Sequence, residues 1–87
     1  MVVDWERVKA LYLGWMDDNP KKTVEAKILE GINAYVERFQ TMPNVVLMSE
    51  ADLNALTQVV NGVQPRKESY IRKNNFWFGI ETANTLR

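Results

Sequence analysis

The chain has 87 residues, and its eleven basic side chains balance eleven acidic ones, so net charge gives it no general attraction to nucleic acid or anionic membranes. Apolar residues make up 46% and charged residues 25%, which is typical of a folded protein rather than a disordered one. Neither His nor Cys occurs, which removes the commonest nucleophiles, neutral-pH bases and transition-metal ligands. We therefore expect a single domain over residues 1–87 that is not an enzyme and has no metal or cofactor.

Residues 4–15 show the spacing of an amphipathic helix. Asp4 is placed to cap its start, and we expect the helix to end within residues 17–20. Two carboxylates there oppose the helix dipole, and Pro20 restricts the residue before it. The apolar residues recur three or four positions apart: Trp5, Val8, Tyr12 and Trp15. We interpret both tryptophans as core residues.

A second helix is predicted from Pro20 or Thr23 to about Gln40. One continuous apolar stripe follows the helical period: Val24, Ile28, Ile32, Tyr35, Val36 and Phe39. Gly31 lies inside this helix at a cost of about 1 kcal/mol relative to Ala. It marks either the close approach of another element or nothing of structural importance.

The period changes after Pro43. Four consecutive apolar residues, Val45–Met48, predict a short strand that is buried on both faces. Ser49 is then placed as the N-cap of a third helix, with Asp52 at the third helical position of an imperfect capping box. Gly62 is suited to end that helix.

The remainder of the chain predicts a loop and a second strand. The segment 63–75 is polar and basic, so we expect an exposed, mobile loop with room for a short strand. Residues 76–81 predict a strand with Trp77 on one face and the two flanking phenylalanines on the other. Residues 82–87 are expected to fray. The predicted fold class is α+β, with three helices packed on a small sheet of about two strands.

The leading functional hypothesis is a small protein-interaction or assembly module. Apolar side chains on both faces of the two predicted strands need more cover than three helices provide. Tryptophan is also common at binding hot spots. The sequence therefore predicts a partner-binding surface at Phe76, Trp77 and Phe78, with residues 45–48 helping to form a shared sheet. The partner is a second copy of the chain, as a dimer or a higher oligomer, or another protein.

A nucleic-acid-binding accessory protein is the alternative. Basic residues with aromatic neighbours are typical of single-strand binding, because cations hold the backbone and aromatic rings stack on bases. The candidate residues are Arg66, Lys67, Arg72 and Lys73. Four such charges predict affinity that is micromolar or weaker at physiological salt, because only about three or four counterions are released.

Carboxylates are the other candidates for chemistry. The pair Asp17-Asp18 and the pair Glu50 and Asp52 offer oxygen ligands for a divalent cation, but neither has the spacing of a calcium loop. We interpret the first pair as helix-ending residues and the second as acids favoured in the first turn of a helix. An enzyme that uses two carboxylates is a third alternative, which no spacing in the sequence favours.

The location is predicted from the absence of targeting signals. The N-terminus lacks the apolar run of a signal peptide, and no segment approaches the roughly 20 apolar residues of a membrane span. We therefore expect a cytoplasmic protein.

One arrangement resembles part of a known family. The predicted long helix is followed by Pro43-Asn44-Val45-Val46-Leu47-Met48-Ser49, then Asp52-Leu53-Asn54-Ala55-Leu56, a polar loop and Phe76-Trp77-Phe78-Gly79-Ile80. Over residues 28–81 this is similar to a stretch of the major capsid proteins of tailed phages, and to small proteins of prophages and mobile elements. Glu81-Thr82 stands where that family has Pro-Val. The resemblance implies an assembly or accessory role and identifies no functional residue.

Overall fold

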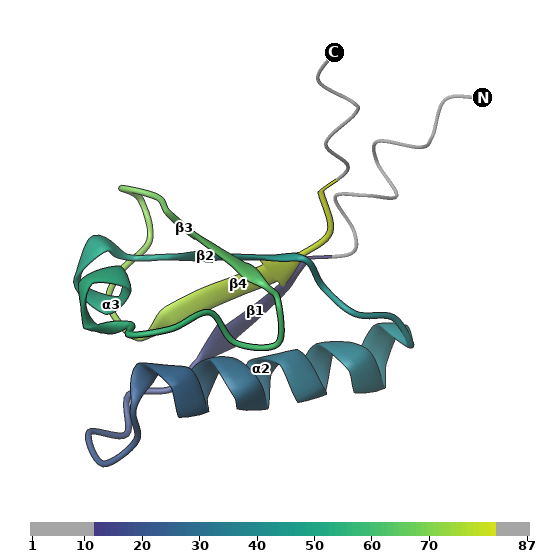
Figure 1. Ribbon diagram of the computed structural model, residues 1–87, viewed down its shortest axis with the longest axis horizontal. Helices are drawn as coiled ribbons and strands as arrows, with labels where there is room; N and C mark the ends of the chain where they lie inside the picture. Colours follow the sequence, from purple (N-terminus) through teal and green to yellow (C-terminus); the bar gives the residue numbers. More distant parts are fainter. Residues whose placement is uncertain (1–11, 82–87) are drawn as a thin grey trace.

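The computed structural model describes residues 12–81, which form one four-stranded mixed sheet and two helices (Figure 1). The strands lie in the order β1-β4-β2-β3, with β2 and β3 parallel and the other two pairs antiparallel. The elements are β1 (Leu13–Met16), α2 (Val24–Phe39), β2 (Val45–Met48), α3 (Glu50–Ala55), β3 (Gln64–Lys67) and β4 (Asn75–Gly79). The fold is α+β, but the predicted arrangement of three helices on a two-stranded sheet is wrong.

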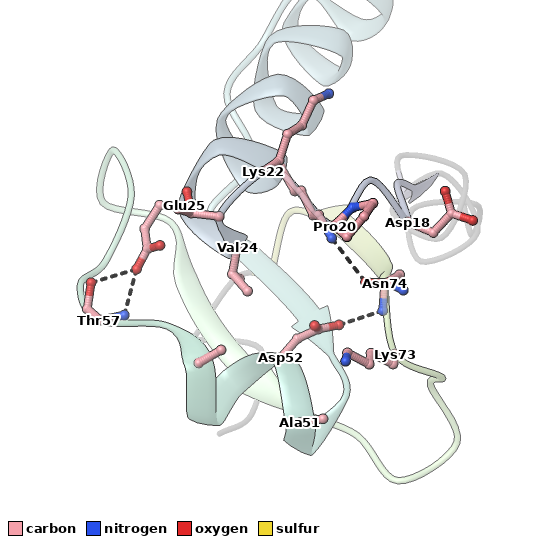
Figure 2. A pocket seen from close by; sticks show the side chains of 13 residues that line it. Asp18, Pro20, Lys22, Val24, Glu25, Ala51, Asp52, Thr57, Lys73 and Asn74 are labelled. Atoms are coloured by element: carbon pink, nitrogen blue, oxygen red, sulfur yellow. Dashed lines mark hydrogen bonds between the residues drawn. The ribbon is translucent and has the colours of Figure 1, made fainter.

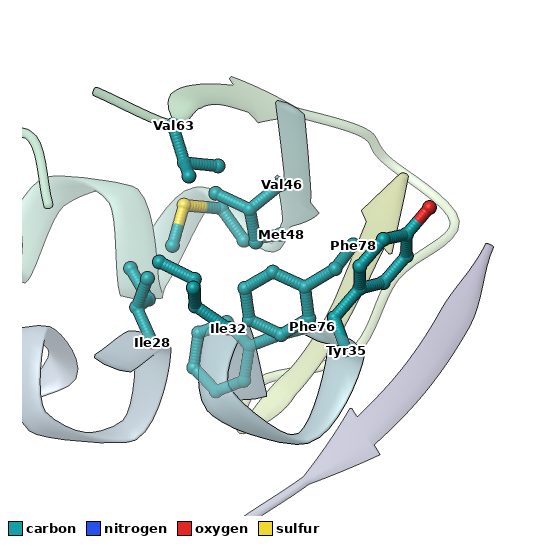
Figure 3. Packing of buried hydrophobic residues seen from close by; sticks show 8 residues of the cluster. All are labelled: Ile28, Ile32, Tyr35, Val46, Met48, Val63, Phe76 and Phe78. Atoms are coloured by element: carbon teal, nitrogen blue, oxygen red, sulfur yellow. The ribbon is translucent and has the colours of Figure 1, made fainter. Parts of the chain in front are cut away.

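The helix α2 was predicted from its apolar stripe, and the structure confirms it. Thr23 caps its start, with Oγ1 accepting a hydrogen bond from the Ala26 amide at 3.1 Å. Gln40 ends it in the left-handed conformation, with φ of 59°. Figure 1 shows α2 running along one face of the sheet, and Figure 3 shows the core formed there. The core residues are Ile28, Ile32, Tyr35, Val46, Met48, Val63, Phe76 and Phe78.

Gly31 marks the closest approach of α2 to the sheet. A Cβ atom at this position would lie 2.2 Å from Cε2 and 2.4 Å from Cζ of the Phe78 ring. Such distances are far below van der Waals contact, so only glycine lets the helix approach this ring as closely. The first of the two interpretations of Gly31 is confirmed.

The first predicted helix, over residues 4–15, is wrong in the part that the structure describes. Residues 13–16 form β1 instead, while residues 4–11 of that prediction lie outside the described residues. Asp17 and Asp18, which were interpreted as helix-ending residues, follow the end of a strand instead. Asp17 donates its amide to the Asn74 carbonyl at 3.0 Å, and its Oδ1 accepts from the Asn19 amide at 3.0 Å. The resulting turn leads the chain from the sheet into α2.

The segment predicted as a basic loop contains the edge strand β3. Proline is confined to sheet edges because it lacks an amide donor, and Pro65 sits in such a strand. Ahead of β3, α3 ends at Ala55 rather than near Gly62. Asn61 and Gly62 have φ of 50° and 75° and form a tight turn, closed by the Val63 amide bonding the Val60 carbonyl at 2.9 Å. The predicted frayed tail, 82–87, lies outside the described residues.

The strand β2 was predicted as fully buried, and all four of its residues are buried. It lies between β4 and β3, however, so both of its edges are already paired. Residues 45–48 therefore present no free edge to a partner, and their part in a sheet shared with another chain stays a prediction. Within residues 12–81, the unpaired edges of the sheet are those of β1 and β3.

Candidate interaction surface

The sheet face opposite α2, called the outer face below, carries the candidate site. The strand registers place four residues in one row across the whole sheet. Gly14 pairs with Trp77, Trp77 with Leu47, and Leu47 with Arg66. Because side chains alternate along each strand, Phe76 and Phe78 point instead to the face covered by α2.

Two glycines seat aromatic rings on the outer face. A Cβ atom at Gly14 would lie 2.9 Å from the Trp77 indole, and one at Gly79 would lie 2.3 Å from the Tyr12 ring. Each ring therefore lies over the bare backbone of the neighbouring strand, an arrangement that covers glycine in sheets. Trp77 still has 44% of its surface exposed.

A shallow groove of about 450 Å³ lies beside these rings. Each of its lining residues comes from a different one of five described segments: Tyr12, Leu47, Arg66, Tyr70 and Trp77. Leu47 is buried, while Tyr70, from the β3–β4 connection, is 72% exposed. The same connection supplies Ile71, which packs with Val45 and Leu47 and covers that part of the outer face. The uncovered apolar surface thus lies over β4 and β1.

The charges around the groove are paired. The Arg66 guanidinium forms two parallel hydrogen bonds to Glu81, of 2.8 and 2.5 Å, and its Nε lies 3.3 Å from Glu68 Oε2. The Glu81 carboxylate raises the pKa of Arg66. Burial, followed by the nearby Glu81, raises the pKa of the Tyr12 hydroxyl. The groove therefore presents apolar rings without an excess of positive charge.

The structure separates the residues predicted for partner binding. Phe76 and Phe78 have no exposed surface and belong to the core, so neither can contact a partner. Trp77 alone of the three reaches solvent. The sequence reasoning missed the other residues of this surface, which are Tyr12, Gly14, Met16 and Tyr70. A glycine between apolar residues, as at Gly14, is a signal for a strand over which another side chain packs.

The four basic residues predicted for nucleic-acid binding do not form one surface. Arg66 lines the outer-face groove, whereas Lys73 lines a second, polar groove. Lys67 and Arg72 are exposed and line neither of these grooves.

The polar groove has a volume of about 610 Å³ and lies among the start of α2, α3 and the residues before β4 (Figure 2). Asp52, which is 2% exposed, accepts hydrogen bonds at Oδ2 from the Asn74 amide (2.6 Å) and the Ser49 hydroxyl (3.1 Å). Lys27, which is 5% exposed, donates to Asn74 Oδ1 at 3.1 Å. Ser49 is the N-cap of α3, as predicted, and accepts from the Asp52 amide. These bonds join α2, α3 and the β3–β4 connection.

A second carboxylate of this groove is also held by structural bonds. Glu25 Oε2 accepts from the amide and hydroxyl of Thr57, at 2.6 and 2.7 Å. These bonds lower the pKa of Glu25. Within residues 12–81, no three His, Cys, Asp or Glu side chains are grouped to hold a metal ion. The polar side chains of this groove therefore hold α2, α3 and the loops beside them together by hydrogen bonds.

Two further observations bear on function. No helix in the described part of the chain is long and apolar enough to cross a bilayer. Comparisons with protein-family models, curated proteins and solved structures give no match. The resemblance to tailed-phage capsid proteins therefore stays a prediction.

Proposed function

We propose that this chain is a non-enzymatic self-association module, in which the outer face around Trp77 packs against a second copy of the chain. The observation that carries the proposal is the group of large apolar side chains left exposed at this face. Trp77 is 44% exposed, Met16 62% and Tyr70 72%. Exposed aromatic residues of this size are typical anchors of protein interfaces.

The charge balance favours a second copy as the partner. The chain has no net charge, so two copies do not repel each other as strongly charged proteins do. Among the described residues that line the groove, the cation is Arg66, which is already paired with Glu81, so this lining does not select a partner of opposite charge. A chain of this size also gains stability by association, because its own core is small.

Replacing Trp77 by alanine is expected to weaken the dimer by about 30-fold or more. The reason is that truncation of an aromatic hot spot costs about 2 kcal/mol or more of binding free energy. Sedimentation equilibrium over a wide concentration range measures the dissociation constant, and circular dichroism checks the fold. Leu29→Ala is the matched control, since Leu29 is 41% exposed on α2, away from the outer face.

Met16→Ala provides a second variant, because a side chain that is 62% exposed contributes little to the fold. It is expected to weaken the dimer without changing the circular dichroism. A mass of 10.1 kDa for the wild-type chain at every concentration contradicts self-association. Equal weakening by Leu29→Ala contradicts the choice of the outer face.

Single-stranded nucleic acid is the second candidate partner. The observation in its favour is a guanidinium, Arg66, beside three aromatic rings that bases can stack on. The pairing of Arg66 with Glu81 opposes it, since a phosphate has to compete with a bidentate carboxylate. We expect no binding of labelled single-stranded DNA or RNA at low or moderate salt. Binding that weakens steeply with salt would favour nucleic acid instead.

A further inference from the structure

The two edges of the sheet are built differently. The edge strand β3 contains Pro65, Arg66 and Lys67, and prolines and charges are devices that block pairing with another chain. The opposite edge strand, β1, has the sequence Leu-Gly-Trp-Met, with no charge and no proline. Among residues 12–81, no strand pairs with the outward edge of β1. Of the two sheet edges in the described part of the chain, the edge at β1 is therefore the one without proline or charge to block pairing.

The backbone groups at that edge belong to Gly14 and Met16. Across β1 and β4, the Asp17 amide donates to the Asn74 carbonyl at 3.0 Å. Hydrogen-bonded and non-hydrogen-bonded pairs alternate along an antiparallel ladder, so Trp15 and Leu13 also direct their backbone groups toward β4. The amides and carbonyls of Gly14 and Met16 point the other way, toward the open edge.

We infer that β1 pairs antiparallel with β1 of a second copy, with Gly14 of each copy opposite Met16 of the other. The inference rests on the proposed self-association and specifies its geometry. The two-fold axis passes between the two copies of Trp15. The outward groups of Gly14 and Met16 then form two hydrogen-bonded pairs related by this axis, and each copy presents the same strand to the other.

This register also accounts for the exposure of Met16 and Trp77. Within one copy, the row on the outer face ends at Gly14, over which the Trp77 indole lies. Pairing adds Met16 of the second copy as the next residue of that row. Because Gly14 has no side chain, this methionine reaches the Trp77 ring, and sulfur–aromatic contacts of this kind are favourable. Met16 and Trp77, which are both exposed in one copy, thus cover each other in the pair.

Amide hydrogen exchange of the full chain, followed by NMR at low and high concentration, tests this geometry. We expect the amides of Gly14 and Met16 to gain about tenfold protection when roughly nine chains in ten are paired, since exchange then occurs through the unpaired tenth. The Trp15 amide, which faces β4, is expected to be protected at both concentrations. Unchanged exchange at Gly14 and Met16 in a sample that sedimentation shows to be dimeric overturns the inference and leaves the proposed function standing.

An edge-blocking variant provides the second readout. Met16→Lys places a charge on the open strand and is expected to weaken the dimer at least tenfold, with circular dichroism unchanged. Gln64→Lys, which places the same charge on the guarded edge strand, is expected to have no effect. Equal dimer affinity for Met16→Lys and wild type overturns the β1 pairing. A wild-type chain that stays monomeric overturns the proposed function, and the inference with it.

Discussion

Phe78→Ala is expected to destabilise the protein by about 3–5 kcal/mol, as truncation of a buried phenylalanine does elsewhere. Phe78 has no exposed surface and contacts α2 where Gly31 brings the helix closest to the sheet. A chain of this length has a free energy of unfolding of about 4–13 kcal/mol, so the loss removes a large share of it. Urea denaturation followed by circular dichroism measures the change.

The neighbouring residue is the matched control for this prediction. Trp77 lies on the same strand with its side chain on the opposite face, 44% exposed. At a concentration where the chain is monomeric, Trp77→Ala is expected to cost far less stability than Phe78→Ala. Equal losses for the two variants would contradict the assignment of the two faces of β4.

Asp52→Ala is expected to destabilise the protein by about 2–4 kcal/mol. The carboxylate accepts bonds from the Asn74 amide and the Ser49 hydroxyl, and it is 2% exposed. Bonds to a charged group contribute about 1.5–3 kcal/mol each, and donors left buried without partners add a further cost. Thermal and urea unfolding measure the loss.

Two variants separate the causes of the Asp52 effect. Asp52→Asn keeps an acceptor oxygen and a similar shape, so it is expected to lose less stability than Asp52→Ala. Glu50→Ala removes an exposed acid of the same helix and is expected to change stability by less than about 0.5 kcal/mol. A loss for Glu50→Ala as large as that for Asp52→Ala would show that the charge of the first turn matters, and not the buried bonds.

Elements with a long or uniform apolar pattern could be predicted from the sequence. α2 carries an apolar stripe over 16 residues, and β2 consists of four apolar residues in succession. β1 could not be separated from a helix, because Tyr12 and Trp15 also fit the helical period and a strand of four residues is too short to decide. β3 could not be predicted because its residues, Gln64–Lys67, lack the apolar alternation of a strand. Asn61-Gly62 just before it is nevertheless a strong turn signal.

The candidate site could be predicted only in part, for a reason of topology. The alternation of β4 correctly assigned Trp77 to a different face from Phe76 and Phe78. Which face the core occupies depends on the packing of α2 against the sheet, and the pattern of one strand does not show it. The contacts of Trp77 with Gly14, and of Tyr12 with Gly79, join residues more than 60 positions apart, and no local pattern reports such pairs.

The contact between Met16 of one copy and Trp77 of the other tests the central claim most directly. An isotope-filtered NOE experiment on an equal mixture of labelled and unlabelled chains detects only contacts between copies. We predict a cross-peak from the Met16 methyl group to the Trp77 indole protons. A dimeric sample in which this cross-peak is missing, while other contacts between copies are seen, would contradict the association through β1 and the outer face.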